Sequence, residues 1–281
     1  MFFAKILIKG INNKQRKGAN KMSTNVSEFS MDFFSLKGKV AIVTGGNTGL
    51  GQGYAVALAK AGADLFIPTH GTNWDETRKL IETLGRKVVF FQADLSKREE
   101  ITGVVEACVK EFGKVDILVN NAGTIRRAPL LEYKDEDWKA VIDINLNAVY
   151  YLSQDVAKIM VAQGSGKIIN IASMLSFQGG KFVPAYTASK HGLAGVTKAF
   201  ANELADKNIQ INAIAPGYIT TNNTAPIRAD EGRSADILSR IPAGRWGDPF
   251  DVMGTVVFLA SRASDYVNGH ILAVDGGWLV R

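Results

Sequence analysis

The chain has 281 residues, 46% of them apolar and 21% charged, which suits one large globular domain with a full core. Residues 1–22 carry six basic side chains and no acidic one, so the net charge of +6 lies in this segment and the 27 remaining basic residues balance the 27 acidic ones. Because residues 23–281 carry no net charge, the sequence argues against a nucleic-acid partner. No run reaches the ~18 apolar residues that a membrane helix needs. A single cysteine, Cys108, excludes an internal disulfide and fits a reducing cytoplasm.

The basic segment at the start of the chain predicts a leader separate from the fold. We expect residues 1–30 to be a disordered leader and residues 31–281 to form one domain, whose folded pattern begins near Phe33. The opening MFFAKILIKG is too short and too interrupted by lysine for a secretory signal. Met22 and Met31 are alternative starts, and a polyanion-binding tail is the alternative role.

A glycine-rich turn follows the first predicted strand, Lys39–Thr44, and precedes a helical pattern, YAVALAKAGA. Gly45, Gly49 and Gly51 would let the backbone turn tightly and approach a pyrophosphate, which rests on amides at the helix amino terminus. A glycine turn in this strand–helix context predicts a dinucleotide site.

The second strand, Asp64–Pro68, should end where the adenosine ribose of a dinucleotide lies. An acid there would bind the 2′-hydroxyl and an Arg would accept a 2′-phosphate, but the chain has Thr69 and His70. Because neither the glycine turn nor this strand end supplies Arg or Lys, we predict NAD rather than NADP. The alternative for His70 is a solvated loop residue.

The third predicted strand, Lys87–Gln92, follows a helix over Asp75–Leu84 and ends before Asp94 and Leu95. The Asp94 carboxylate can accept a hydrogen bond from an adenine amino group. Its alternative role is to cap the next helix, which opens near Ser96.

The fourth strand, Asp116–Val119, leads into Asn-Asn-Ala-Gly at residues 120–123, which we expect to pass close to the cofactor, although these residues also suit an ordinary loop. Arg126 and Arg127 come next, on the side where substrate should lie. Paired guanidiniums suit a carboxylate, and plain surface charge is the alternative.

A long helical stretch, Asp135–Gln163, carries Asn145 among apolar neighbours. A buried amide needs partners. We expect Asn145 either to make a structural hydrogen bond or to hold a water that links Lys190 to solvent.

Ser173 follows a buried strand, Lys167–Ala172, and Tyr186 and Lys190 stand four residues apart on a helix running to about Lys207. The two side chains therefore share a helix face. A neighbouring ammonium should lower the pKa of the phenol and allow proton exchange near neutrality. The pair alone occurs by chance in many proteins, and it gains weight from the glycine turn before it.

The strand Ile209–Ala215 ends in Pro216-Gly217, and Tyr218–Arg240 then departs from the regular alternation as an irregular insertion, which we interpret as a lid or specificity segment. A helix, Asp251–Ser261, and a strand, Ile271–Val274, close the pattern. No metal-ligand cluster is apparent, so we predict no metal.

These motifs together resemble the classical short-chain dehydrogenase/reductase family over about residues 33–281. The resemblance implies a Rossmann-type α/β fold, with one doubly wound sheet of seven parallel strands and helices on both faces, usually in a homotetramer. The implied catalytic residues are Asn145, Ser173, Tyr186 and Lys190. The implied cofactor-binding residues are Gly45, Asn47, Thr48, Gly49, Leu50, Gly51, Thr69, His70, Asp94, Leu95, Asn121, Ala122, Gly123, Tyr186, Lys190, Pro216, Gly217 and Ile219. The implied substrate-binding residues are Arg126, Arg127, Ser173, Met174, Gln178, Tyr186 and Asn223.

Several loops, among them GTIRRAPLLE, RIPAGRWGDP and SDYVNGHILAVDGGW, are similar to those of the bacterial 2-dehydro-3-deoxy-D-gluconate 5-dehydrogenases within that family. The similarity implies NAD-dependent interconversion of a ketone and an alcohol on a six-carbon keto-deoxy sugar acid, in uronate catabolism. Gluconate 5-dehydrogenase and 3-oxoacyl-carrier-protein reductase are the enzyme alternatives. A nucleotide-sensing binding protein without turnover is the alternative from another class.

Overall fold

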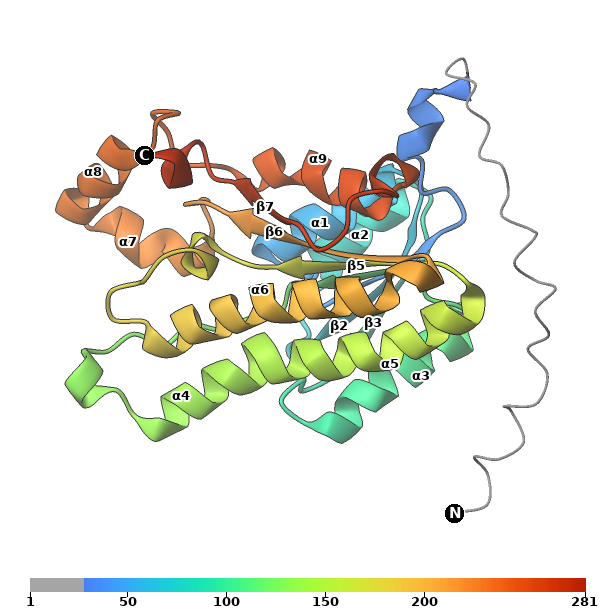
Figure 1. Ribbon diagram of the computed structural model, residues 1–281, viewed down its shortest axis with the longest axis horizontal. Helices are drawn as coiled ribbons and strands as arrows, with labels where there is room; N and C mark the ends of the chain where they lie inside the picture. The colour runs from blue at the N-terminus through green and yellow to red at the C-terminus, as the bar shows by residue number, and fades with distance from the viewer. Residues whose placement is uncertain (1–27) are drawn as a thin grey trace. The chain divides into compact units, whose positions relative to one another are not determined.

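The computed structural model describes residues 28–281 (Figure 1). The chain divides into two units, Met1–Met31 and Asp32–Arg281, and the second holds the fold. Of the leader predicted at residues 1–30, residues 1–27 lie outside the described residues. Among the described residues, none of the helices combines the length and apolar character that a bilayer crossing requires.

The second unit contains one sheet of seven strands that all run parallel. Its strands, in chain order, are β1 Val40–Val43, β2 Asp64–Thr69, β3 Val88–Gln92, β4 Ile117–Asn120, β5 Gly166–Ile171, β6 Ile209–Pro216 and β7 Ile271–Val274. Their spatial order is β3-β2-β1-β4-β5-β6-β7, so the chain winds outward from β1 in one direction and then from β4 in the other. The predicted doubly wound sheet is confirmed.

The helices cover both faces of this sheet (Figure 1). They are α1 Gly49–Lys60, α2 Asp75–Thr83, α3 Arg98–Phe112, α4 Asp135–Ile142, α5 Ala148–Gln163, α6 Pro184–Leu204, α7 Ala225–Ala229, α8 Glu231–Arg240 and α9 Pro249–Ala260. Apolar side chains of α1 and α9 pack on one face of the sheet, and those of α3 and α5 pack on the other. The central strands are buried on both sides, which explains why they read as continuous apolar runs.

The predicted helix over Asp135–Gln163 has a break in its middle. A π-helical turn at Asp143–Asn147 separates α4 from α5. Such turns occur often at functional sites, and this one contains Asn145.

The insertion predicted as irregular at Tyr218–Arg240 is largely helical, so that part of the prediction is wrong. A short turn at Asn222–Thr224 leads into α7 and α8. The Asp230 carboxylate caps α8 by accepting from the Arg233 amide at 3.0 Å, and Ile227 and Ile237 bury the inner side of the insertion. This short amphipathic spacing was hidden in the sequence by the many charged residues around it.

Candidate active site

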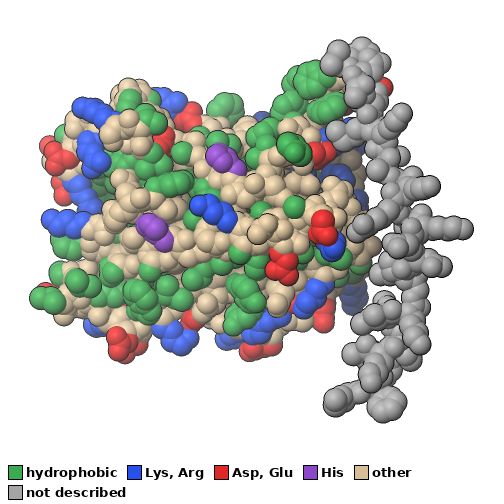
Figure 2. Space-filling model, viewed as in Figure 1, with side chains coloured by type: hydrophobic (Ala, Val, Ile, Leu, Met, Phe, Trp, Pro, Cys, Tyr) green, Lys and Arg blue, Asp and Glu red, His purple; other side chains and the backbone are tan. Residues whose placement is uncertain are grey.

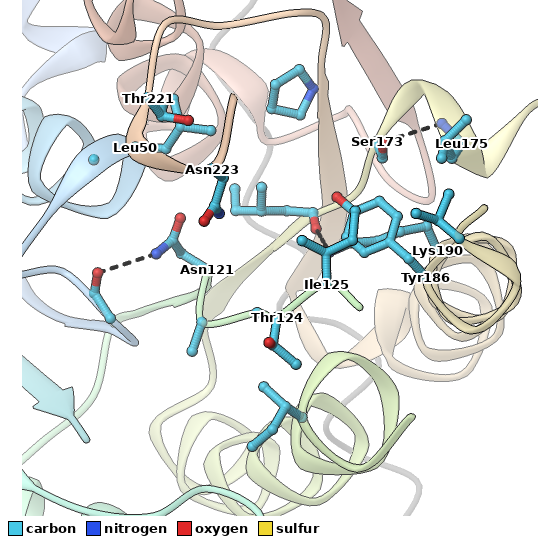
Figure 3. A pocket seen from close by; sticks show the side chains of 18 of the residues that line it. Leu50, Asn121, Thr124, Ile125, Ser173, Leu175, Tyr186, Lys190, Thr221 and Asn223 are labelled. Atoms are coloured by element: carbon cyan, nitrogen blue, oxygen red, sulfur yellow. Dashed lines mark hydrogen bonds between the residues drawn. The ribbon is translucent and has the colours of Figure 1, made fainter. Parts of the chain in front are cut away.

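A cavity of about 1290 Å³ lies at the carboxyl ends of the strands. Its lining comes from the ends of β1 through β6 and from the insertion after β6, which is where ligands bind in open parallel sheets. Every predicted cofactor-binding and substrate-binding residue lines this cavity, and of the predicted catalytic residues only Asn145 does not. Figure 3 shows several of these side chains converging from different elements.

The glycine turn after β1 has the geometry that a phosphate cradle requires. Gly45 and Gly49 have φ of +61° and +56°, a conformation that favours glycine. A Cβ added to Gly51 would lie 2.1 Å from the Gly45 carbonyl oxygen and 2.5 Å from the Asn121 amide nitrogen. The three glycines therefore fit a nucleotide pyrophosphate at the amino terminus of α1.

The segment after β4 holds this glycine turn in place. The Asn121 side chain donates to the Thr44 and Gly45 carbonyl oxygens at 2.9 and 3.3 Å, while the Thr44 hydroxyl accepts from the amides of Asn121 and Ala122. Of residues 120–123, Asn121 fixes the loop, and Asn121, Ala122 and Gly123 line the cavity, whereas their approach to the cofactor stays a prediction.

Residues 69–73, which begin at the last residue of β2 and lie at the predicted adenosine end of the cavity, include no acid and no guanidinium. Thr69 is buried, and its hydroxyl donates to the Gly71 carbonyl oxygen at 2.7 Å. His70 is exposed and lines the cavity, as does Asn47, whose amide donates to the Asn73 side chain at 2.8 Å.

Asp94 is held locally as well as lining the cavity. Its carboxylate accepts from the Ser96 hydroxyl and amide at 2.7 and 3.0 Å, and these hydrogen bonds keep its pKa below the usual value. The predicted capping role is wrong, because α3 begins at Arg98 with Lys97 as its N-cap and no side-chain cap, whereas Asp94 binds Ser96 before the helix. The predicted contact with adenine stays a prediction.

Ser173, Tyr186 and Lys190 come together on one wall of the cavity. Ser173 follows β5, is 8% exposed, and its hydroxyl accepts from the Leu175 amide at 3.1 Å. Tyr186 lies in the first turn of α6, and Figure 3 shows its hydroxyl directed toward Ser173. Lys190 lies one turn further along the same face, with its Nζ 5.4 Å from the centre of the Tyr186 ring.

Burial governs the protonation of both groups on α6. It lowers the pKa of Lys190 to about 8. It raises the pKa of Tyr186, and a hydrogen bond with Ser173 and the positive charge of Arg127 oppose that rise without overcoming it. The expectation that the phenol's pKa falls toward neutrality is therefore wrong for the chain alone. The neighbouring Arg127 does lower this pKa, but desolvation of the phenolate is the larger effect.

Asn145 makes structural hydrogen bonds. It is fully buried in the π-helical turn, where its side-chain oxygen accepts from the Thr124 amide at 2.8 Å. Its amide nitrogen donates to the Thr124 carbonyl oxygen at 2.9 Å and to the Ser189 hydroxyl at 3.2 Å. The residue thus ties the loop after β4 to α6, and its predicted water relay to Lys190 stays a prediction.

The two arginines after β4 have different surroundings. Arg126 forms an ion pair with Asp137 at 3.4 Å and donates to the Thr124 hydroxyl at 2.9 Å. Arg127 donates to the Asn223 carbonyl oxygen at 3.5 Å, and its charge reaches Tyr186. The structure therefore separates the predicted pair and brings only Arg127 toward the catalytic wall.

Among the cavity residues that were not identified individually from the sequence are Tyr218, Arg233, Arg240 and Trp278. Trp278 lies near the end of the chain, and its ring centre is 4.8 Å from that of Tyr218. Two aromatic residues sixty positions apart give no local signal of contact, so only the fold brings them together.

The fold and the cavity define the class of protein. A doubly wound parallel sheet, a glycine cradle at the first strand–helix turn and a Ser-Tyr-Lys wall are the parts of a pyridine-nucleotide-dependent dehydrogenase. The model of the family described as enoyl-(acyl carrier protein) reductase matches residues 45–279.

The chain belongs to the short-chain dehydrogenase/reductase family. It is 59% identical to 2-dehydro-3-deoxy-D-gluconate 5-dehydrogenase of Bacillus subtilis (strain 168), over 89% of this chain and 98% of that protein. It is 58% identical to the Escherichia coli (strain K12) protein of the same name, over 88% of this chain and 98% of that protein. A crystal structure of a putative 2-deoxy-D-gluconate 3-dehydrogenase from Agrobacterium tumefaciens with bound NADP is 52% identical, with a TM-score of 0.84 over 88% of this chain and 99% of that one.

Proposed function

We propose that the protein interconverts a ketone and a secondary alcohol on a six-carbon keto-deoxy sugar acid, as a 2-dehydro-3-deoxy-D-gluconate 5-dehydrogenase in uronate catabolism. The observation that carries the proposal is the Ser173, Tyr186 and Lys190 wall beside the glycine cradle in one cavity. The identities of 58–59% to proteins of that name support the substrate class.

The glycine cradle and the segments beside it would hold the cofactor. Gly45, Gly49 and Gly51 leave room for a pyrophosphate, and Asn121 keeps that turn in shape. A bound pyridine nucleotide supplies or accepts the hydride. We propose NAD as the physiological form, since residues 69–73 at the end of β2 include no Arg or Lys for a 2′-phosphate.

The catalytic wall would handle the proton and the carbonyl oxygen. The Ser173 hydroxyl holds that oxygen beside the Tyr186 phenol. The pKa of the buried phenol lies above its ordinary value, so Tyr186 is protonated at neutral pH and can donate the proton that ketone reduction requires. Lys190, whose pKa lies at about 8, is a buried cation that can stabilise the phenolate left behind.

The substrate would lie between this wall and the insertion after β6. Met174, Gln178 and Asn223 line that part of the cavity, together with Arg127. Closing α7 and α8 over the substrate would exclude water from the reacting carbonyl. The homotetramer and the cytoplasmic location remain predictions from the sequence.

The test compares two keto acids. NADH oxidation is followed with the 2,5-diketo-3-deoxy acid that arises from unsaturated uronate, and in parallel with 5-ketogluconate. The proposal predicts a higher kcat/KM for the first substrate. A higher value for the second would assign gluconate 5-dehydrogenase activity instead, and nucleotide binding without turnover of either would favour a sensing protein. Repeating the assay with NADPH measures the cofactor preference directly.

A further inference from the structure

One end of the cavity is formed by α8 and the C-terminal turn Trp278–Val280, which lie next to each other (Figure 1). Arg233 and Arg240 are seven residues apart on α8, and Ile237 lies between them on the same helix face. Ile237 is buried in the same apolar cluster as Trp278, so this face of α8 is the inner one. Both arginines line the cavity there.

Aromatic side chains and the C-terminus hold these arginines in place. The guanidinium carbon of Arg240 stacks 4.0 Å above the Trp278 ring, and Tyr218 packs edge-on against that ring with centres 4.8 Å apart. The Arg281 side chain donates to the Ser239 carbonyl oxygen at 2.9 Å. This end of α8 is therefore anchored to the last residues of the chain.

The positive charge on the inner face of α8 is not neutralised by the described part of the chain. Within residues 28–281, neither Arg233 nor Arg240 forms an ion pair. The acids that line the cavity are Asp94, Glu136 and Asp143, which come from other elements. Figure 2 shows both basic and acidic side chains over α8, but the acids of that helix, Glu231 and Asp236, do not line the cavity.

The Tyr218 hydroxyl can donate at this end of the cavity, which Asn222 and Asn223 also line. Burial raises the pKa of the Tyr218 phenol, and the positive charges of Arg233 and Arg240 oppose the rise. All three residues line the cavity. Trp278 is 5% exposed, and its indole Nε1 has no hydrogen-bond acceptor among the described residues. Two guanidiniums without an acidic partner, beside a phenol hydroxyl, are complementary to an anion.

We propose that Arg233, Arg240 and the Tyr218 hydroxyl bind the carboxylate of the substrate, while its ketone lies at Ser173 and Tyr186. This inference rests on the proposed sugar-acid function and names the group that recognises the acid. Met174 directly follows Ser173 and packs in the same cluster as Trp278, so one continuous wall joins the two ends. Arg126 forms an ion pair with Asp137, and the charge of Arg127 acts on Tyr186, whereas both arginines of α8 are without an acidic partner among the described residues.

The double variant R233Q/R240Q removes both charges and keeps polar side chains of similar length. We expect its KM for the keto acid to rise by about 10- to 100-fold with little change in kcat, because each charged hydrogen bond is lost from substrate and transition state alike. R228Q is the matched control, since Arg228 lies in α7, donates to the Thr221 carbonyl oxygen at 3.3 Å and does not line the cavity.

Competitive inhibition by a charged and a neutral sugar derivative tests whether the site recognises the carboxylate rather than the shape of the sugar chain. D-gluconate should inhibit the wild type more strongly than its neutral counterpart D-glucitol, and R233Q/R240Q should lose this preference while R233K/R240K retains part of it. Unchanged nucleotide affinity and thermal unfolding would show that the double variant is folded. A double variant with wild-type KM and wild-type preference for gluconate would overturn the carboxylate assignment alone. A wild type that reduces no sugar acid would overturn the proposed function with it.

Discussion

The Lys190 ammonium donates a hydrogen bond to the Ile171 carbonyl oxygen at 2.6 Å. Ile171 is the last residue of β5 and stands two residues before Ser173. This contact fixes the buried cation to the strand that presents the serine. The side chain that supports Tyr186 and the backbone that positions Ser173 are thus parts of one rigid junction between β5 and α6.

Lys190 should make stability depend on pH in a defined direction. Its folded pKa of about 8 lies below the unfolded value, so the unfolded chain binds more protons between these pH values and stability rises as the pH increases through 8. Relative to the Lys190→Met variant, the wild type should gain about 2 kcal/mol between pH 7 and pH 9.5. Chemical denaturation of both proteins at the two pH values measures this difference, and an equal gain in both would refute it.

Gly51→Ala should abolish nucleotide binding. The added methyl group would lie 2.1 Å from the Gly45 carbonyl oxygen, so the cradle must open. Gly103→Ala is the matched control, because Gly103 lies within α3 with no neighbouring atom within 4 Å of the added carbon. The control should keep its affinity and gain up to about 1 kcal/mol from better helix propensity. Calorimetric titration with NADH distinguishes the two, and tight binding by the first variant would contradict the assigned cradle.

Asn145→Ala should destabilise the fold. The half-buried Thr124 amide would lose its acceptor, at a cost of about 1 kcal/mol. We expect a fall in kcat as well, because the loop after β4 would no longer be tied to α6. Urea unfolding and steady-state kinetics measure the two effects. A variant with reduced kcat at unchanged stability would instead favour the water relay predicted from the sequence.

Arg126 and Arg127 should differ although they are neighbours. Arg127→Gln removes a charge that lowers the pKa of Tyr186, so the basic limb of the kcat/KM profile assigned to this phenol should move to higher pH. Arg126→Gln should leave that limb in place, because Arg126 pairs with Asp137. Equal displacement in the two variants would rule out a specific role for Arg127.

The positions of the strands along the chain and most of the cavity residues could be predicted from sequence because they depend on local patterns. β1, the glycine turn and α1 are adjacent in the chain, as are Tyr186 and Lys190, and parallel sheets collect strand ends at one edge. The sign of the pKa change of Tyr186 could not be predicted, since it depends on burial by elements far away in the sequence. The contact between Arg240 and Trp278 could not be predicted either, because α8 and the C-terminal turn meet only in the folded chain.

Tyr186 is the residue on which the proposed chemistry depends most directly. Tyr186→Phe removes the proton donor and keeps the ring that packs beside Lys190. The measurement is kcat for the keto acid together with NADH affinity in this variant. The account predicts that kcat falls by about 100- to 10,000-fold while NADH affinity is kept. Near-normal turnover would contradict the assignment of Tyr186 as the proton donor.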